Sequence, residues 1–248
     1  MIVIVAALRQ EFAWIEEQSA WGGPEEDEGV RFCAGTLAGQ KVALVVSGVG
    51  EERAAHATRL AVKRYAPGAV ISIGYAGGLV PEASAGALIV PDSVAHDAAT
   101  APSTEESPDA RLLGLARSAA ARLGVAALGG RLLTVPAVVS TKEAKKAVQG
   151  RTGAVAVDME SAAVGAVCRE LGIPVLYLRC VTDGSEDDIP INQEISAAFR
   201  GKIRVGAILW WFLKHPSVAL AIFRLYRRAH RASALLGCVI LALCESLR

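Results

Sequence analysis

Short runs of apolar residues alternate with amphipathic stretches along most of the chain. Seven runs have the length of a β-strand and are bounded by turn residues: 2–7, 41–47, 69–74, 87–90, 132–135, 154–157 and 175–181. Most of them are continuously apolar, which is typical of strands that are covered on both faces. Between them, residues 51–65, 109–123 and 159–171 have the apolar spacing of helices that pack on one face. The alternation predicts an α/β fold with a central mixed β-sheet flanked by helices.

Two polar loops interrupt this alternation. Residues 22–29 read GGPEEDEG and predict an acidic turn. Residues 97–109 form a long polar stretch without a hydrophobic period, which is typical of a functional loop. We therefore expect this second loop to act as a lid.

The segment after residue 202 has a different character. We divide the chain into a domain of residues 1–202 and an apolar helical extension of residues 203–248. Helical spacing places Arg224, Arg227, Arg228 and Arg231 on one face, and a basic amphipathic helix can bind an anionic membrane surface. The alternative is a core or dimer-interface helix followed by an amphipathic hairpin. The longest uncharged run, residues 232–244, is shorter than the roughly 20 residues needed to span a bilayer.

The composition narrows the class of protein. Of the 248 residues, 52% are hydrophobic, the mean hydropathy is +0.37 and the net charge is +1. Such a chain can bury a large core, which excludes general disorder, and its charge gives no reason to expect nucleic acid as a partner. The five cysteines form no Cys-x-x-Cys pair and the four histidines are scattered, so we expect neither a metal site nor a disulfide framework. The N-terminal apolar run lacks a basic start, so we interpret it as a strand and expect a cytoplasmic protein.

Two motifs come directly after predicted strands, where α/β sheets place their ligands. Residues 72–79 read SIGYAGGL, and Gly77 and Gly78 would let a ligand approach the backbone closely. A glycine pair also ends many strands that have no such role. Residues 179–185 read RCVTDGS, and burial of Asp183 at the strand end would raise the pKa of its carboxyl. The alternative for Asp183 is an Asx turn.

A third motif, residues 156–161, reads AVDMES and lies where a predicted strand becomes a helix. Asp158 and Glu160 could bind the hydroxyl groups of a sugar, while Met159 packs on an apolar ring. The alternative is structural, because the helix dipole stabilises acidic residues in the first turn.

In this order and spacing, the three motifs resemble the nucleoside phosphorylase/nucleosidase superfamily, over roughly residues 1–200. Residues 6–11 (AALRQE) and the turn at residues 47–50 (SGVG) match the same pattern. The most similar familiar pattern is that of the methylthioadenosine/S-adenosylhomocysteine nucleosidases. The resemblance implies an enzyme that needs no metal and no organic cofactor, and we expect a homodimer.

The resemblance also implies roles for two acidic residues. Glu11 matches the acid/base that activates the attacking nucleophile, and Asp183 matches the general acid that protonates the purine ring, at N7. The chemistry agrees, because cleavage of a ribosyl–purine bond needs a neutralised leaving group and an activated nucleophile. Asp183 must then be protonated near neutral pH, which burial could achieve.

The remaining matches form an expected substrate site. Glu160 matches the acceptor of the ribose hydroxyls, Met159 lies against the ribose, and Gly77 belongs to the backbone of the base pocket. Aliphatic residues 138 and 139 stand near the position where the family often has an aromatic that stacks on the base. The expected substrate-binding residues are Ser47, Gly50, Gly77, Val138, Val139, Asp158, Met159 and Glu160.

The resemblance leaves two candidates for the acceptor of the ribosyl group, water and phosphate. Phosphorylases of the superfamily commonly carry an arginine two residues before the glycine of the Gly-rich strand end, where this chain has Ser72. Their common Gly-Asp-Pro start is also absent from this sequence. Both departures favour hydrolysis. The alternative is an unusual phosphate site built from Arg53, Arg9 or the backbone N–H groups of residues 47–50.

The apolar extension resembles that of the hopanoid-associated phosphorylase subfamily. This implies removal of adenine from a lipid-linked nucleoside, adenosylhopane, with the extension in peripheral contact with a membrane. The alternative within the same chemistry is a soluble nucleosidase for methylthioadenosine or S-adenosylhomocysteine. The alternative of another class is a non-catalytic nucleoside sensor.

Overall fold

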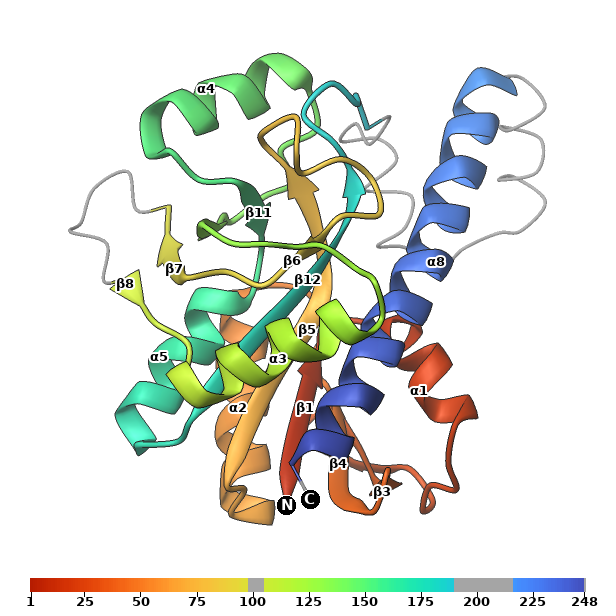
Figure 1. Ribbon diagram of the computed structural model, residues 1–248, viewed down its shortest axis with the longest axis vertical. Helices are drawn as coiled ribbons and strands as arrows, with labels where there is room; N and C mark the ends of the chain where they lie inside the picture. Colours follow the sequence, from red (N-terminus) through yellow and green to blue (C-terminus); the bar gives the residue numbers. More distant parts are fainter. Residues whose placement is uncertain (98–104, 190–215, 248) are drawn as a thin grey trace.

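The computed structural model describes residues 1–97, 105–189 and 216–247. Within these residues, 12 strands form one mixed sheet with helices on both of its faces (Figure 1). The predicted α/β class, a central mixed sheet flanked by helices and followed by a C-terminal helix, is confirmed.

The elements follow one another in an order that alternates strands with helices over much of the chain. The strands are β1 (Ile2–Ala6), β2 (Glu25–Asp27), β3 (Val30–Leu37), β4 (Gln40–Val46), β5 (Ala69–Gly78), β6 (Leu88–Ile89), β7 (Ser93–His96), β8 (Glu105–Glu106), β9 (Ala127–Leu128), β10 (Arg131–Thr134), β11 (Ala156–Asp158) and β12 (Val175–Asp183). The helices are η1 (Arg9–Phe12), α1 (Ala13–Glu17), α2 (Glu51–Tyr65), α3 (Ala110–Arg122), α4 (Lys142–Thr152), α5 (Ser161–Leu171) and α8 (Pro216–Ser246).

Strand β5 lies at the centre of the sheet and changes partners along its length. Its first part runs parallel to β1 on one side and to β12 on the other, with Ile71 in register with both Ile4 and Leu176. Its last residues, Gly77 and Gly78, pair antiparallel with β11. The ends of β1, β5, β11 and β12 therefore border the same cleft.

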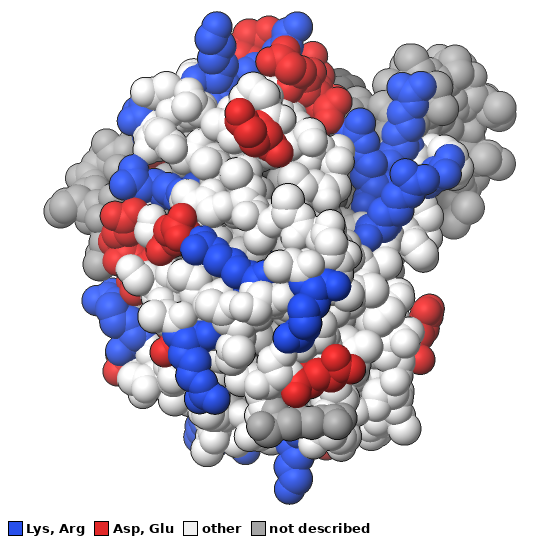
Figure 2. Space-filling model, viewed as in Figure 1, with Lys and Arg blue, Asp and Glu red and all other residues white. Residues whose placement is uncertain are grey.

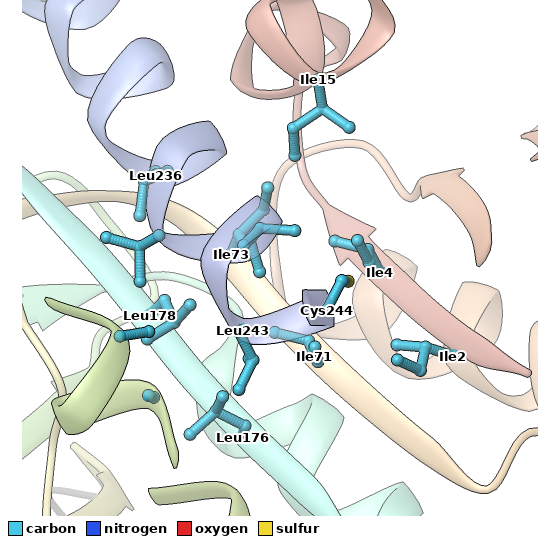
Figure 3. Packing of buried hydrophobic residues seen from close by; sticks show 14 of the residues in the cluster. Ile2, Ile4, Ile15, Ile71, Ile73, Leu176, Leu178, Leu236, Leu243 and Cys244 are labelled. Carbon is cyan, nitrogen blue, oxygen red and sulfur yellow. The ribbon is translucent and has the colours of Figure 1, made fainter. Parts of the chain in front are cut away.

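The central strands bury both faces, which explains their continuously apolar sequences. Along β1, Ile2 and Ile4 belong to one core, whereas Val3 and Val5 belong to the other, because successive side chains point to opposite faces. The first core includes residues of α1, α3 and α8, and Figure 3 shows isoleucines and leucines of the strands around the last turns of α8, which carry Leu236, Leu243 and Cys244. The second core lies under α2 and α5.

Helix α8 has two parts with different surroundings. Most of residues 232–244 are buried in the first core, whereas Phe223 and Tyr226 are 56% and 65% exposed. The predicted hairpin is wrong, because one helix runs without a break from Pro216 to Ser246. By length and composition, residues 223–246 could cross a membrane, but half of the apolar window is buried inside the protein. The predicted boundary between residues 202 and 203 lies outside the described residues.

Some elements differ from the predicted ones. Residues 25–27 of the predicted acidic turn form the edge strand β2 against β3. Strand β3 contains accessible as well as buried positions and so lacks a continuous apolar run. Helix α4 buries only Lys145, so its sequence has no apolar stripe to reveal it. Most of the predicted lid, residues 98–104, lies outside the described residues.

The close approach of α8 to α1 predicts a stability effect at Gly237. A Cβ at this position would overlap the indole ring of Trp14. We therefore expect Gly237→Ala to lower the free energy of unfolding by about 1–3 kcal/mol, the usual cost of overpacking, measured by urea denaturation. Gly114→Ala in α3 is the matched control, because nothing lies within 4 Å of a Cβ there. Equal unfolding midpoints for the two variants would contradict the packing of α8 on α1.

Candidate active site

A cleft of about 280 Å³ opens where the central strands end. Four carboxylates line it, namely those of Glu11, Asp158, Glu160 and Asp183. These residues lie at or just after the ends of β1, β11 and β12, three strands that all pair with β5. The sheet topology thus brings together acidic groups that are far apart in the sequence.

Glu11 lies on the short helix η1 that follows β1. Its side chain accepts hydrogen bonds from the backbone N–H of Leu8 at 2.8 Å and of Tyr75 at 3.1 Å. Burial raises the pKa of the Glu11 carboxyl to about 7, although these hydrogen bonds and the charge of Arg179 favour the ionised form. A carboxyl with such a pKa can take up or release a proton near neutrality.

Asp158 joins the strands behind the cleft. Its Oδ1 accepts a hydrogen bond from the Thr134 hydroxyl at 2.7 Å. Its Oδ2 accepts hydrogen bonds from the Ser161 backbone N–H at 3.0 Å and from the Arg179 guanidinium at 2.9 Å. Both carboxylate oxygens are therefore engaged inside the protein. Ser72, which also bonds to Arg179, belongs to the same network.

Glu160 comes at the start of α5, two residues after Asp158. Its Oε1 accepts a hydrogen bond from the backbone N–H of Gly50 at 2.8 Å, which connects α5 to the turn before α2. Burial, followed by the charge of Asp158, raises the pKa of the Glu160 carboxyl. The neighbouring Met159 is partly buried and packs against the apolar cluster that contains Val157.

Asp183 ends β12 and is 5% exposed. Its Oδ1 accepts a hydrogen bond from the Thr182 hydroxyl at 2.8 Å, and its Oδ2 contacts Lys145 Nζ at 2.6 Å. Burial raises the pKa of the Asp183 carboxyl, and the hydrogen bond and charge of Lys145 oppose that rise. Burial and Lys145 therefore act in opposite directions on the pKa of this carboxyl.

The end of β5 passes close to these acidic groups. A Cβ on Gly74 would lie 3.1 Å from Glu11 Oε1, and a Cβ on Gly77 would lie 3.1 Å from Asp183 Oδ2. A Cβ on Gly78 would overlap the carbonyl oxygen of Ala83. The glycines of the first motif thus make room for side chains of the site and for the neighbouring backbone.

The rim of the cleft is apolar. Leu8, Val49 and Val138 are each more than a third exposed although they are large and hydrophobic. With Val139, Ile189 and Leu225 of α8 they line the entrance. A ligand that fills this cleft would meet carboxylates at one side and aliphatic side chains at the other.

The structure brings together eight of the ten expected site residues: Glu11, Gly77, Val138, Val139, Asp158, Met159, Glu160 and Asp183 all line the cleft. The two others lie beside it. Gly50 contacts Glu160 as described above, and the Ser47 hydroxyl lies 3.2 and 2.9 Å from the backbone carbonyls of Ala6 and Gly48.

Two further residues of the site were not found from the sequence. Lys145 stands in the lysine-rich stretch KEAKK, which is typical of a solvated helix surface, and nothing in that pattern marks it as buried. Arg179 opens the motif of residues 179–185, but that motif by itself indicates no role for its arginine. A charged residue in the middle of an otherwise apolar strand was the signal that could have identified it.

Among the described residues, no group of three or more His, Cys, Asp or Glu side chains could hold a metal ion. The described residues that line the cleft include neither arginine nor lysine. Three carboxyl groups of the cleft, those of Glu11, Glu160 and Asp183, have raised pKa values and can take part in acid–base chemistry.

Relatives of similar sequence share one name. A 5'-methylthioadenosine/S-adenosylhomocysteine nucleosidase of Shewanella halifaxensis is 30% identical over 225 residues, which are 84% of this chain and 98% of the relative. A relative with the same name from Shewanella piezotolerans matches at the same identity and coverage.

Solved structures share the fold. The nucleosidase of this name from Neisseria meningitidis, in complex with methylthio-immucillin-A, has a TM-score of 0.78 at 21% identity and covers 99% of this chain and 98% of its own. The enzyme from Colwellia psychrerythraea in complex with adenine has a TM-score of 0.79 at 20% identity, covering 99% and 95%.

The family model extends through nearly all of the chain before α8. Residues 1–211 match the model described as the Phosphorylase superfamily. The predicted class of enzyme, a nucleoside phosphorylase or nucleosidase, is confirmed at this level. The sequence motifs and the acidic cleft of the protein are consistent with this match, and the chain belongs to the phosphorylase superfamily.

Proposed function

We propose that this protein is a purine nucleosidase that hydrolyses the N-glycosidic bond of an adenine nucleoside with an apolar 5′ substituent. One observation carries the proposal: two buried carboxyls with raised pKa values, Glu11 and Asp183, line a single cleft that also contains the acidic Glu160. The names of the curated relatives, methylthioadenosine/S-adenosylhomocysteine nucleosidases, support the same substrate class.

In the proposed reaction, the protonated Asp183 carboxyl gives its proton to the purine ring at N7. The C1′–N9 bond breaks, its electron pair stays with the neutral purine, and an oxocarbenium-like ribosyl group remains. Water attacks C1′ and loses a proton to the Glu11 carboxylate. Glu160 accepts hydrogen bonds from the ribose hydroxyls. We assign Asp158 to positioning, because its oxygens already hold Thr134, Ser161 and Arg179.

Water is the acceptor that fits the charges of the cleft. Four carboxylates and no described cation line it, and such a lining disfavours a phosphate dianion. Neither cation expected for a phosphate site lines the cleft: Arg9 pairs with Glu16 at the surface, and the Arg53 side chain lies over Gly48 in the turn beside the cleft.

The size of the substrate's 5′ group is set by the apolar rim. Leu8, Val49 and Leu225 offer aliphatic surface for a thioether or alkyl chain. A methylthio group is one substituent that would use this surface. We extend the proposal to a homodimer in the cytoplasm, as expected from the sequence.

Substitution of either acid is expected to abolish most of the activity. Asp183→Asn and Glu11→Gln should each lower kcat by about 10²–10⁴-fold, the usual effect of losing a general acid or base, in an assay of adenine release from methylthioadenosine. Omission of phosphate should leave the wild-type rate unchanged. The exposed Glu143→Gln is the control. Adenine binding without adenine release by the intact protein would favour the nucleoside sensor instead.

The pKa of Glu11 predicts the acidic side of the pH profile. Since the Glu11 carboxylate must accept a proton and burial places its pKa at about 7, lowering the pH through 7 protonates it and should reduce kcat/KM. We expect the rate to fall about tenfold per pH unit below that value. A kcat/KM that stays constant down to pH 5, with the fold intact by circular dichroism, would remove Glu11 from this role.

A lipid-linked substrate such as adenosylhopane is the second candidate. The observation that favours it is the position of α8: Leu225 lines the cleft, and Phe223 and Tyr226 of the same helix are more than half exposed. Figure 2 shows basic side chains gathered over the upper turns of this helix. Arg228 pairs with Asp187, so the exposed part of the predicted arginine stripe consists of Arg224, Arg227 and Arg231.

This second candidate predicts binding to anionic membranes. Each arginine near an anionic surface contributes about 1 kcal/mol, so replacing the three exposed arginines by glutamate should weaken binding to phosphatidylglycerol vesicles by roughly 100-fold or more. High salt should weaken the wild-type binding similarly. The matched control replaces three exposed basic residues elsewhere: Lys41, Arg111 and Lys146. Equal vesicle binding by both triple variants, or none by the intact protein, would leave only the soluble substrate.

A further inference from the structure

Lys145 is a fully buried lysine on a helix that is otherwise accessible. It is 0% exposed, and it is the residue that α4 buries. Its Nζ lies 2.6 Å from Asp183 Oδ2, 2.7 Å from the carbonyl oxygen of Gly184 and 3.0 Å from the carbonyl oxygen of Asp187. The three hydrogen bonds that an ammonium group can donate therefore all reach the segment that carries Asp183.

Burial of the Lys145 ammonium group costs free energy, so its position needs an explanation. Removing an ammonium group from water costs several kcal/mol unless it is paired and fully hydrogen-bonded. A helix such as α4, with no buried apolar residue among its described positions, gains little from inserting a charge. Lys145 itself does not line the cleft, whereas Asp183 does. Lys145 thus contacts the Asp183 carboxyl on the side that faces away from the cleft.

Other charges around the pair cannot replace Lys145. From β12 and the loop after it, Asp187 faces the pair with a negative charge, but its carboxylate is held by Arg228 of α8 at 2.8 Å. Arg228 also donates a hydrogen bond to the carbonyl oxygen of Thr182 at 3.3 Å. Across the cleft, Glu11 and Glu160 are acidic.

We propose that Lys145 is a positioning residue that sets the acid strength of Asp183, an inference that rests on the proposed nucleosidase function. When the Asp183 proton moves to N7 of the purine, the carboxylate that remains is buried and needs a counter-charge. Lys145 supplies that charge at 2.6 Å and needs no movement to do so. It also holds Asp183 Oδ2 against Gly77, so that the carboxyl keeps one orientation.

Loss of the Lys145 charge should change the pKa of Asp183 in one direction only. Burial raises the pKa of Asp183, and Lys145 limits the rise. Loss of the positive charge should therefore raise the pKa further, by about 1–3 units for a close opposite charge. A carboxyl that is more often protonated but is a weaker acid extends activity to higher pH and lowers the maximal rate. With a Brønsted coefficient of about 0.5, the loss in kcat is roughly 3- to 30-fold.

The test compares Lys145→Met with Lys146→Met, the exposed neighbour on the same helix. The pH dependence of adenine release from methylthioadenosine is measured for both variants and for the intact protein. We expect the basic limb of kcat against pH to move up by at least one unit in Lys145→Met only, with a lower plateau. Propylammonium added to Lys145→Ala should restore part of the plateau and move the limb back.

A second measurement does not depend on activity. The carboxyl carbon of Asp183 is titrated by NMR in protein labelled with ¹³C at aspartate carboxyls, and Asp183→Asn assigns its resonance. We expect a higher pKa in Lys145→Met than in the intact protein and in Lys146→Met. This result would support the inference even if the intact protein released no adenine, an outcome that would overturn the proposed function alone.

Two results would overturn the inference. One is an unchanged pKa of Asp183 in folded Lys145→Met. The other is a rate that falls equally at every pH while the limb stays in place, which is the pattern of a purely structural residue. Thermal unfolding of Lys145→Met shows that the comparison is made on folded protein, and Lys145→Gln, which keeps part of the hydrogen bonding without the charge, replaces it if methionine prevents folding.

Discussion

The arrangement of the acidic cleft depends on one buried cation, Arg179. Its side chain is 2% exposed, and its five N–H donors meet acceptors on β5, β11, β12 and α5. A buried guanidinium is tolerated only with such complete pairing, so these four elements have one relative position. The same charge limits the rise in pKa that burial imposes on Glu11 and Glu160. The Arg179 guanidinium therefore fixes the relative position of these elements and also limits the pKa values of the two carboxyls.

The second requirement is room beside the central strand. Gly74 and Gly77 of β5 let the carboxyls of Glu11 and Asp183 lie against the backbone, about 3 Å from where a Cβ would be. Close contact excludes water from one side of each carboxyl and so contributes to the burial that raises their pKa values. A strand with larger residues at these positions would push the acids toward solvent. The glycines thus make room for the two carboxyls and also help to raise their pKa values.

Helix α8 links the core to the entrance of the cleft. From Ala232 onward it replaces solvent on one face of the sheet, and one turn earlier Arg228 binds Asp187 and the Thr182 carbonyl beside the acid Asp183. Farther toward its start, Leu225 reaches the rim. One continuous helix therefore stabilises the fold, supports the loop after β12 and presents apolar surface to a ligand.

The sequence by itself determined the fold class, the central strands and the set of acidic residues at strand ends, because burial on both faces leaves continuous apolar runs and because Asp183 follows such a run directly. Only the tertiary structure decided how these acids are used. The roles of Asp158 and Lys145 depend on partners more than 20 residues away, Arg179 and Asp183. Local patterns encode which face of an element is buried, whereas the pairing of buried charges arises from the three-dimensional packing that brings distant strands together.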